Sequence, residues 1–231
     1  MLVIGHRGAA ALAPENTLEG IEAAVRARSD GVEIDVRLSA DGVLVLMHDP
    51  DVARTTSGTG RVDASTAKEL ARLGVPALDD VLEAAPAELL LVVEVKGNPW
   101  EAGHDAGEPV AHALATTLAE RGSRRIVVSS GNPAALAIVR EKAPGVRTAV
   151  LTSAGFDPAS NLAAAVAGGH DECHVPAQIL EESFVERARA AGRAVVAWTV
   201  NDALTLRAFR SWGVDGAITD DPAAARAVLA G

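Results

Sequence analysis

Short runs of apolar, mostly β-branched residues alternate along the whole chain with longer stretches rich in alanine, leucine and arginine. The short runs predict strands at 2–6, 31–36, 89–96, 125–130, 147–151, 171–175, 194–199 and 214–219. The longer stretches predict helices at 17–28, 108–121, 133–142, 158–167, 179–191, 202–212 and 221–230, with shorter ones at 65–73 and 79–85. Repeated βα units indicate a parallel sheet, and eight of them are typical of a TIM (β/α)8 barrel. No linker or repeat divides the chain, so we expect a single barrel domain over residues 1–231.

The starts of several helices can be recognised from a capping side chain followed by proline at the first helical position. The pairs are Asn132-Pro133, Asp157-Pro158 and Asp221-Pro222. Asn16 and Thr17 could cap the first helix in the same way, and Glu15 could complement its dipole. On this interpretation all these polar residues are structural.

The run from Val43 to His48 does not fit the alternation of strands and helices. Only Ser39-Ala40-Asp41-Gly42 separates it from the second strand, which is too short for a parallel crossover. We therefore expect a β-hairpin that folds His48 back over the barrel mouth. Residues 49–88 then form an excursion before the third strand, and such an insertion could shape a substrate pocket.

Acidic residues alternate with apolar ones on two neighbouring predicted strands. In Val32-Glu33-Ile34-Asp35-Val36 the two carboxylates share one face, because strand side chains alternate. Val93-Glu94-Val95-Lys96 repeats the pattern on the third strand, with Glu94 and Lys96 facing inward. Three carboxylates crowded inside a barrel need compensation, and a hard cation with oxygen ligands supplies it. The alternative is an ion-pair network with Lys96 and Arg7.

Two histidines are candidates for proton transfer at the mouth. His6, in His6-Arg7-Gly8, ends the first strand on the face where barrel enzymes place their catalysis. His6 or His48 taken alone would more often be structural. Beside an acidic cluster, two imidazoles supply a base for a nucleophile and an acid for a departing alkoxide, and Arg7 and Lys96 supply positive charge for a phosphate. The combination favours metal-dependent cleavage of a phosphodiester.

These residues belong to a set of short motifs spread along the chain. The motifs are His6-Arg7-Gly8, Pro14-Glu15-Asn16-Thr17, Glu33-Ile34-Asp35-Val36, Asp41-Gly42, His48-Asp49, Glu94-Val95-Lys96, Trp198-Thr199-Val200-Asn201, Asp215-Gly216 and Thr219-Asp220. In order and spacing the chain resembles the glycerophosphodiester phosphodiesterases, from the first predicted strand to the last.

The resemblance implies a TIM-type barrel that hydrolyses glycerophosphodiesters to sn-glycerol 3-phosphate and an alcohol, with one calcium or magnesium ion. The matching positions are Glu33, Asp35 and Glu94 for the ion, His6 and His48 for acid/base catalysis, Arg7 and Lys96 for the phosphate, and Trp198 for the pocket wall. The order in which the histidines act stays open, as does the choice between water and a neighbouring glycerol hydroxyl as nucleophile.

The chain departs from the family at positions that bear on the alcohol. The family often has an aromatic residue after a Ser-Ser pair on the fourth strand, whereas Gly131 follows Ser129 and Ser130 here. The chain also contains no tyrosine. The pocket wall is therefore expected to be more open, and the identity of the alcohol stays undetermined.

The composition of the chain limits the classes of molecule that it is expected to bind. A net charge of −10 works against nucleic acid or an anionic membrane, which leaves a small-molecule substrate. No run reaches the roughly 18 uncharged residues that a membrane span needs. Met1 leads straight into apolar residues without a leader pattern, so we expect a soluble, cytoplasmic protein. Cys173 is the only cysteine and forms no internal disulfide. The oligomeric state is not predicted.

Alternative interpretations remain for the function and for single residues. A lipid phosphodiesterase acting on lysophospholipids or inositol phospholipids would need a large apolar entrance or a membrane-binding helix. A non-catalytic barrel could bind a phosphorylated ligand instead. His170 and His174 could suggest zinc, but a second pair of ligands with suitable spacing is missing. His174 could also reach the mouth, and Trp198 could be plain core.

Overall fold

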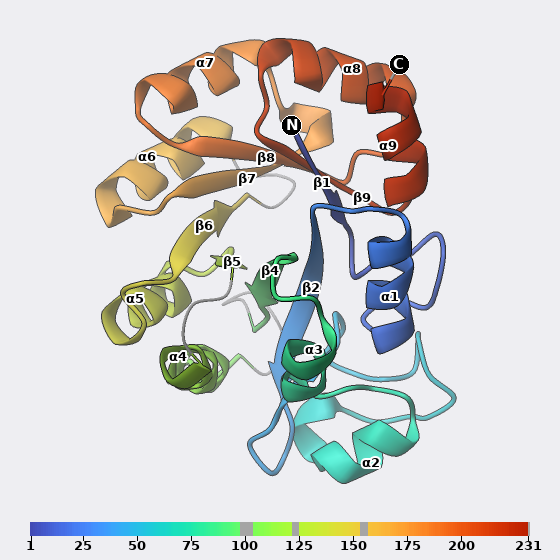
Figure 1. Cartoon of the computed structure of the whole chain (residues 1–231). Helices are drawn as coiled ribbons and strands as arrows, with labels where there is room; N and C mark the ends of the chain where they lie inside the picture. Colours follow the sequence, from blue (N-terminus) through green and yellow to red (C-terminus); the bar gives the residue numbers. More distant parts are fainter. Residues whose placement is uncertain (98–103, 122–124, 153–156, 231) are drawn as a thin grey trace.

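Eight parallel strands close into a barrel in the computed structural model, which describes residues 1–97, 104–121, 125–152 and 157–230 (Figure 1). They are β1 (Leu2–Gly5), β2 (Gly31–Leu38), β4 (Leu90–Val95), β5 (Ile126–Ser130), β6 (Arg147–Leu151), β7 (Glu172–Pro176), β8 (Ala194–Trp198) and β9 (Gly216–Thr219). β1 pairs with both β9 and β2, and this closes the sheet. The predicted TIM barrel is confirmed, and each predicted strand lies within two residues of its observed bounds.

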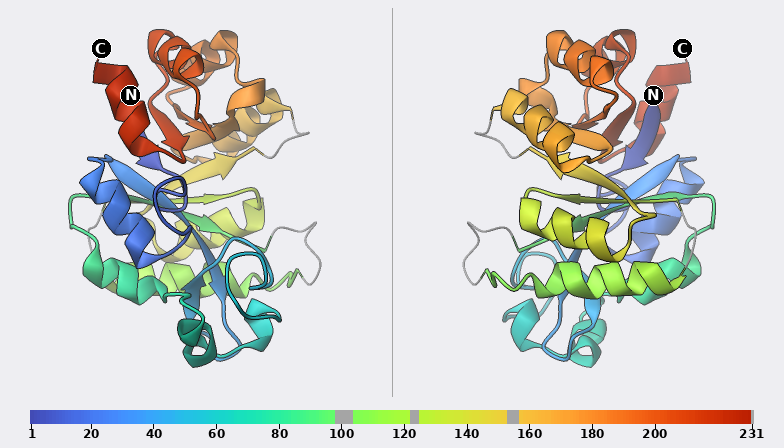
Figure 2. Two further views of the ribbon diagram at one scale, coloured as in Figure 1. Left: turned by 90° about the vertical axis from the view of Figure 1, so that its right-hand side faces the viewer. Right: turned by 90° about the vertical axis from the view of Figure 1, so that its left-hand side faces the viewer.

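Helices cover the outside of the barrel, as the side views in Figure 2 show. They are α1 (Leu18–Arg26), α2 (Ala67–Arg72), α3 (Leu78–Ala84), α4 (Pro109–Arg121), α5 (Pro133–Lys142), α6 (Pro158–Gly168), α7 (Glu182–Ala190), α8 (Ala203–Trp212) and α9 (Pro222–Ala230), with short 3-10 helices at Val62–Ala64 and Ala177–Ile179. Among the described residues, no helix combines the length and apolar character needed to cross a bilayer.

Capping side chains start these helices largely as predicted. Asn132 accepts a hydrogen bond from the N–H of Ala134, and Asp157 accepts one from that of Ala159. Asp221 accepts from the N–H of Ala224. The predicted cap of α1 is correct for Thr17, whose hydroxyl accepts from the N–H of Gly20 at 3.1 Å, but wrong for Asn16, which binds elsewhere.

Apolar side chains fill the barrel on both faces of its strands. The larger cluster lies between strands and helices, and a smaller one fills the interior. The interior cluster consists of Ile4, Leu90, Val92, Val127, Ala149, Val196 and Ile218. His174 is buried too, and its Nε2 lies 2.9 Å from Oε2 of Glu172 at the start of β7. The suggestion that His174 reaches the mouth is therefore wrong.

A hairpin carries the chain from β2 toward the barrel mouth. β3 (Leu44–Leu46) pairs antiparallel with β2, so the predicted hairpin is confirmed, although β3 ends before His48. Nε and Nη2 of Arg37 donate to the carbonyl oxygen of His48 at 3.0 and 2.7 Å. The following excursion packs on the hairpin through its own apolar cluster, formed by Val45, Met47, Val52, Val62, Leu70 and Val75. Hairpin and excursion together hold His48 in place.

Candidate active site

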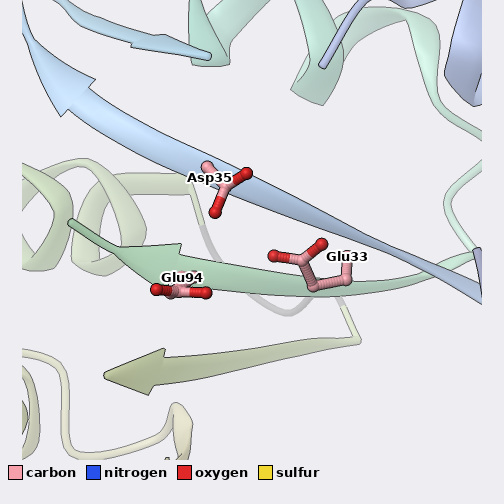
Figure 3. A group of neighbouring side chains, drawn as sticks. All are labelled: Glu33, Asp35 and Glu94. Atoms are coloured by element: carbon pink, nitrogen blue, oxygen red, sulfur yellow. The ribbon is translucent and has the colours of Figure 1, made fainter. Parts of the chain in front are cut away.

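Three carboxylates converge from the middle of β2 and the carboxyl end of β4 (Figure 3). Glu33 and Asp35 point from β2 toward Glu94 on β4, and Asp35 pairs in register with Glu94. One oxygen from each residue can be chosen so that all three lie within 4.8 Å of one another. The alternation of side chains along the two strands produces the expected convergence. The role of these groups as metal ligands stays a prediction.

Lys96 compensates part of this negative charge. Its Nζ lies 3.0 Å from Oδ1 of Asp35 and 2.7 Å from Oε1 of Glu94, and Nε of Arg7 lies 3.5 Å from Oδ2 of Asp35. Burial alone would raise the pKa of Asp35, but the charge of Lys96, together with His48, Arg7 and the hydrogen bond from Asn16, outweighs burial and holds that pKa far below the usual range. Asp35 and Glu94 therefore form ion pairs with Lys96, as the alternative interpretation of the acidic cluster expected.

Glu33 lacks such compensation. Burial, and then the charge of Asp35, raise the pKa of Glu33 to about 8. Its Oε2 accepts a hydrogen bond from the backbone N–H of Arg7, but no cationic side chain in the described part of the chain forms an ion pair with it. A buried carboxyl group without a cationic side-chain partner, beside two further carboxylates, is a donor set that suits a hard divalent cation. The residues present therefore fit a calcium or magnesium ion.

Asn16 orients one of these carboxylates rather than capping a helix. Its Nδ2 donates to Oδ2 of Asp35 at 2.8 Å, and its Oδ1 accepts from the N–H of Asp35 at 3.0 Å. Asn16 is buried and adopts a left-handed backbone conformation with φ 55°. Both the nitrogen and the oxygen of its side-chain amide therefore bind Asp35 and fix the orientation of that residue.

His6 lies directly after β1 and is held by a carboxylate from the far end of the chain. Its Nδ1 lies 2.6 Å from Oδ1 of Asp220, and Oδ2 of Asp220 accepts from Nδ2 of Asn201 at 2.6 Å. Burial lowers the pKa of His6, but the hydrogen bond with Asp220 and the charges of Glu33 and Asp220 together outweigh burial, and the pKa is raised above its ordinary value. This arrangement leaves Nε2 as the ring nitrogen available to a ligand.

His48 has a similar arrangement with the next residue in sequence. Its Nδ1 lies 2.7 Å from Oδ1 of Asp49. Burial, and then the charge of Lys96, lower the pKa of His48 below its ordinary value. A hydrogen bond from Arg54 holds the pKa of Asp49 at about 2, so that carboxylate stays charged. Each histidine therefore has its Nδ1 on a carboxylate, while their pKa values shift in opposite directions.

Several polar residues of the site were not assigned these roles from the sequence. Glu15 forms ion pairs with Nη1 of Arg7 at 2.8 Å and with Nη2 of Arg54 at 2.7 Å, so the helix-dipole interpretation misses its main contacts. Asp220 belongs to a motif of the resembling family, and that motif was the available signal for it. Arg54 had no comparable signal, because no periodicity relates it to its partners.

Trp198 ends β8 and packs against the interior cluster. Its Nε1 is buried and has no hydrogen-bond partner among the described residues. The ring therefore contributes to the core, as one interpretation of the sequence expected, and the described residues offer no acceptor to the indole N–H. Its place in the wall of a substrate pocket stays a prediction.

The histidines near β7 bind separate partners. Nδ1 of His170 lies 2.9 Å from Oγ1 of Thr148, whereas His174 binds Glu172. Within the described ranges, the one group of three or more acidic, histidine or cysteine side chains close enough to share an ion is the acidic cluster of β2 and β4.

Comparisons with known proteins agree on one family. The sequence profile of the Glycerophosphoryl diester phosphodiesterase family matches residues 6–224. The glycerophosphodiester phosphodiesterase of Caldanaerobacter subterraneus subsp. tengcongensis is 30% identical over 243 residues, which cover 96% of this chain and 94% of that protein.

Solved structures give the same result for the fold. A phosphodiesterase of Oleispira antarctica in complex with the product sn-glycerol-3-phosphate has a TM-score of 0.88 at 25% identity, covering 100% of this chain and 97% of that one. The glycerophosphodiester phosphodiesterase of Thermotoga maritima has a TM-score of 0.82 at 28% identity, covering 97% and 96%.

Fold, site and matches together define a phosphodiester hydrolase built on a TIM barrel. The family match extends over nearly the whole chain, from the first catalytic candidate to the last helix. The protein belongs to the glycerophosphoryl diester phosphodiesterase family.

Proposed function

We propose that the protein hydrolyses glycerophosphodiesters to sn-glycerol 3-phosphate and an alcohol, with one calcium or magnesium ion bound by Glu33, Asp35 and Glu94. The observation that carries the proposal is the convergence of these three carboxylates near two carboxylate-bound histidines. The sn-glycerol-3-phosphate bound to the Oleispira antarctica relative supports the class of substrate. When bound, the ion would supply positive charge against the phosphate and fix its orientation.

Arg7 and Lys96 are the groups that bind the phosphate in this proposal. Nε of Arg7 makes only the 3.5 Å ion contact with Asp35 and has no hydrogen-bond partner in the described part of the chain, so its hydrogen-bonding capacity is unused. Lys96 is buried beside the acidic cluster, where the charges of Glu94 and Asp35 outweigh burial and raise its pKa. Both cations therefore stay charged and neutralise the negative charge that grows as the phosphate is attacked.

His6 and His48 transfer the protons. Asp220 and Asp49 accept from Nδ1 and so favour the tautomer in which Nε2 of a neutral ring accepts a proton. One imidazole takes a proton from the nucleophile, and the other, as imidazolium, protonates the departing alkoxide. Opposite pKa shifts in the two rings suit such a division of roles.

The nucleophile is either water or the substrate's own glycerol hydroxyl, which would form a cyclic phosphate first. Stopping the reaction before completion and identifying the phosphate species by ³¹P NMR separates the two routes. A transient cyclic glycerophosphate appears only when the hydroxyl attacks.

A substrate panel tests the proposed function. The purified protein is assayed with glycerophosphodiesters of several alcohols and with lysophospholipids, with calcium or magnesium and with EDTA, and each product is identified. We expect sn-glycerol 3-phosphate from the glycerophosphodiesters and loss of turnover in EDTA that added ion restores. Preferred cleavage of the lysophospholipids would favour the lipid phosphodiesterase. Binding without turnover of any substrate would favour a non-catalytic barrel.

A further inference from the structure

Arg54 uses its whole guanidinium group to join two carboxylates at the mouth of the barrel. Its Nε donates to Oδ2 of Asp49 at 2.5 Å. Its Nη1 and Nη2 donate to the two oxygens of Glu15 at 2.8 and 2.7 Å. The contact with Glu15 is bidentate, and such paired bonds have the strongest directional preference among ion pairs.

Each of the two carboxylates also holds a residue of the proposed site. Oδ1 of Asp49 lies on Nδ1 of His48 at 2.7 Å, and Oε1 of Glu15 accepts from Nη1 of Arg7 at 2.8 Å. A continuous chain of charged contacts therefore runs from His48 through Asp49, Arg54 and Glu15 to Arg7. It connects the loop after β1 with the excursion after β3, and Arg54 is the link between them.

Fold stability alone does not account for this arrangement. The side chain of Arg54 is 46% exposed, and exposed ion pairs contribute little to folding. The rigid fork of an arginine does fix the direction of both acceptors, which a lysine, as a compact point charge, cannot do. Without Arg54, Glu15 and Asp49 would lose their common partner and retain two negative charges beside the mouth.

We propose that Arg54 is a positioning residue that holds the imidazole of His48 and the guanidinium of Arg7 in their working orientations at the same time. Arg54 acts through Asp49 and Glu15 and does not touch the substrate. The inference rests on the proposed function, since it concerns how the same site is kept in order for phosphodiester cleavage.

Substitution of Arg54 tests this role by kinetics. Misplacement of reacting groups by about 1 Å can cost about 10²-fold in rate, so we expect kcat/KM of Arg54→Gln to fall by up to that factor. Loss of His48 orientation lowers kcat, and loss of Arg7 orientation raises KM, so both constants should change. Arg54→Lys should recover only part of the loss.

Arg61→Gln is the matched control. Arg61 lies in the same excursion, is 43% exposed and binds Asp63 through two contacts of 2.8 and 2.5 Å, and its side chain forms no hydrogen bond or ion pair with a described residue of the proposed site. We expect wild-type kinetics for this variant. Equal losses in Arg61→Gln and Arg54→Gln would overturn the proposal, because a general weakening of the excursion would then explain both.

A second measurement follows the route through the two carboxylates. In an Asp49→Asn/Glu15→Gln background, Arg54→Gln should add almost no further loss of kcat/KM, because its partners are already neutral. ¹⁵N NMR of the His48 ring in the metal-free protein should show a changed tautomer balance in Arg54→Gln and not in Arg61→Gln. An unchanged His48 spectrum with wild-type kinetics in Arg54→Gln would contradict the positioning role. Absence of turnover in the wild-type protein would instead contradict the proposed function.

Discussion

The two candidate catalytic histidines make the same kind of hydrogen bond, but different groups surround them. Each places Nδ1 on a carboxylate, at 2.6 Å for His6 and 2.7 Å for His48. Asp220 is itself held by the neutral amide of Asn201, whereas Asp49 is held by the cationic Arg54. The pKa of His6 is nevertheless raised, through Asp220 and the charge of Glu33, whereas burial and the charge of Lys96 lower the pKa of His48.

Removal of either imidazole should abolish most of the turnover and leave metal binding intact. We expect His6→Ala and His48→Ala each to lower kcat by about 10²- to 10⁴-fold, the range that proton transfer contributes. The losses in the double variant should not multiply, because the two rings act in one reaction. Calorimetric titration with calcium or magnesium checks that the ion still binds. Multiplied losses would indicate that the two rings act independently.

Replacement of Asp220 should change the pH dependence through His6. The hydrogen bond with Asp220 is the largest of the contributions that raise the pKa of His6 against the effect of burial, so Asp220→Asn should lower that pKa. The limb of the kcat/KM profile that depends on His6 then moves to lower pH. A shift of the acidic limb identifies His6 as the base, and a shift of the alkaline limb identifies it as the acid. Unchanged limbs, together with an unchanged His6 titration by NMR, would show that Asp220 does not set this pKa.

The sequence predicts the acidic cluster because short-range rules suffice for it. Glu33 and Asp35 are two positions apart on one strand, and Glu94 lies on the strand that pairs with it. Asp220 is 214 positions from His6 in sequence, so only closure of the barrel brings them together. For the same reason the sequence suggests only a helix cap for Asn16 and a helix-dipole role for Glu15, whereas Asp35 and Arg54, which they bind, lie on other segments.

At the scale of elements, the number of residues between two predicted strands indicates how the strands are connected. The five residues between β2 and β3 are too few for a parallel crossover and allow only a hairpin, and the structure has one. β3 stops at Leu46, earlier than the predicted run to His48, because the chain turns there to begin the excursion. Met47 is buried, as its apolar pattern indicates, but its side chain packs against the excursion and not in the sheet. Periodicity could not separate these two environments.

Replacement of Gly42 should destabilise this hairpin through the conformation of the backbone alone. It adopts a left-handed conformation with φ 79°, and a Cβ atom there would meet no atom within 4 Å. Gly42→Ala should therefore destabilise the fold by about 1 kcal/mol, a loss of roughly 2–4 °C in Tm. Gly42→Asn, whose side chain tolerates this conformation, should lose less. Thermal melting of the two variants makes the comparison, and equal Tm values for both would contradict a conformational origin.

At the scale of the whole molecule, the proposed ion connects catalysis with folding. Glu33 and Asp35 come from one strand and Glu94 from its neighbour, so their mutual repulsion acts on the wall of the barrel itself. Lys96 offsets the charges of Asp35 and Glu94 but forms no ion pair with Glu33. An ion that binds only the native state at a hundred times its Kd adds about 2.7 kcal/mol, or roughly 5–10 °C in Tm for a chain of this size.

Glu33 is therefore the residue at which removal of charge should stabilise the metal-free fold. Its pKa is raised from an ordinary 4.5 to about 8, chiefly by burial and by the charge of Asp35. A raised pKa means that the native state loses stability as the pH rises from the unfolded value toward the folded one, because the unfolded chain releases its proton first. In EDTA, Glu33→Gln should melt at a higher temperature than the wild type at pH 8, and the difference should vanish near pH 4.5.

Glu94→Gln is the matched control for this experiment. It also removes one negative charge from the cluster, but it gives up the 2.7 Å contact with Lys96, so we expect no gain in Tm without metal. Both variants should be inactive and should gain much less than the wild type from added calcium or magnesium, because each has lost a ligand. A metal-free Glu33→Gln protein that melts below the wild type at pH 8 would show that the native fold already compensates this carboxylate. The acidic cluster would then be an ion-pair network that includes Glu33, and the case for a bound cation would lose its main physical support.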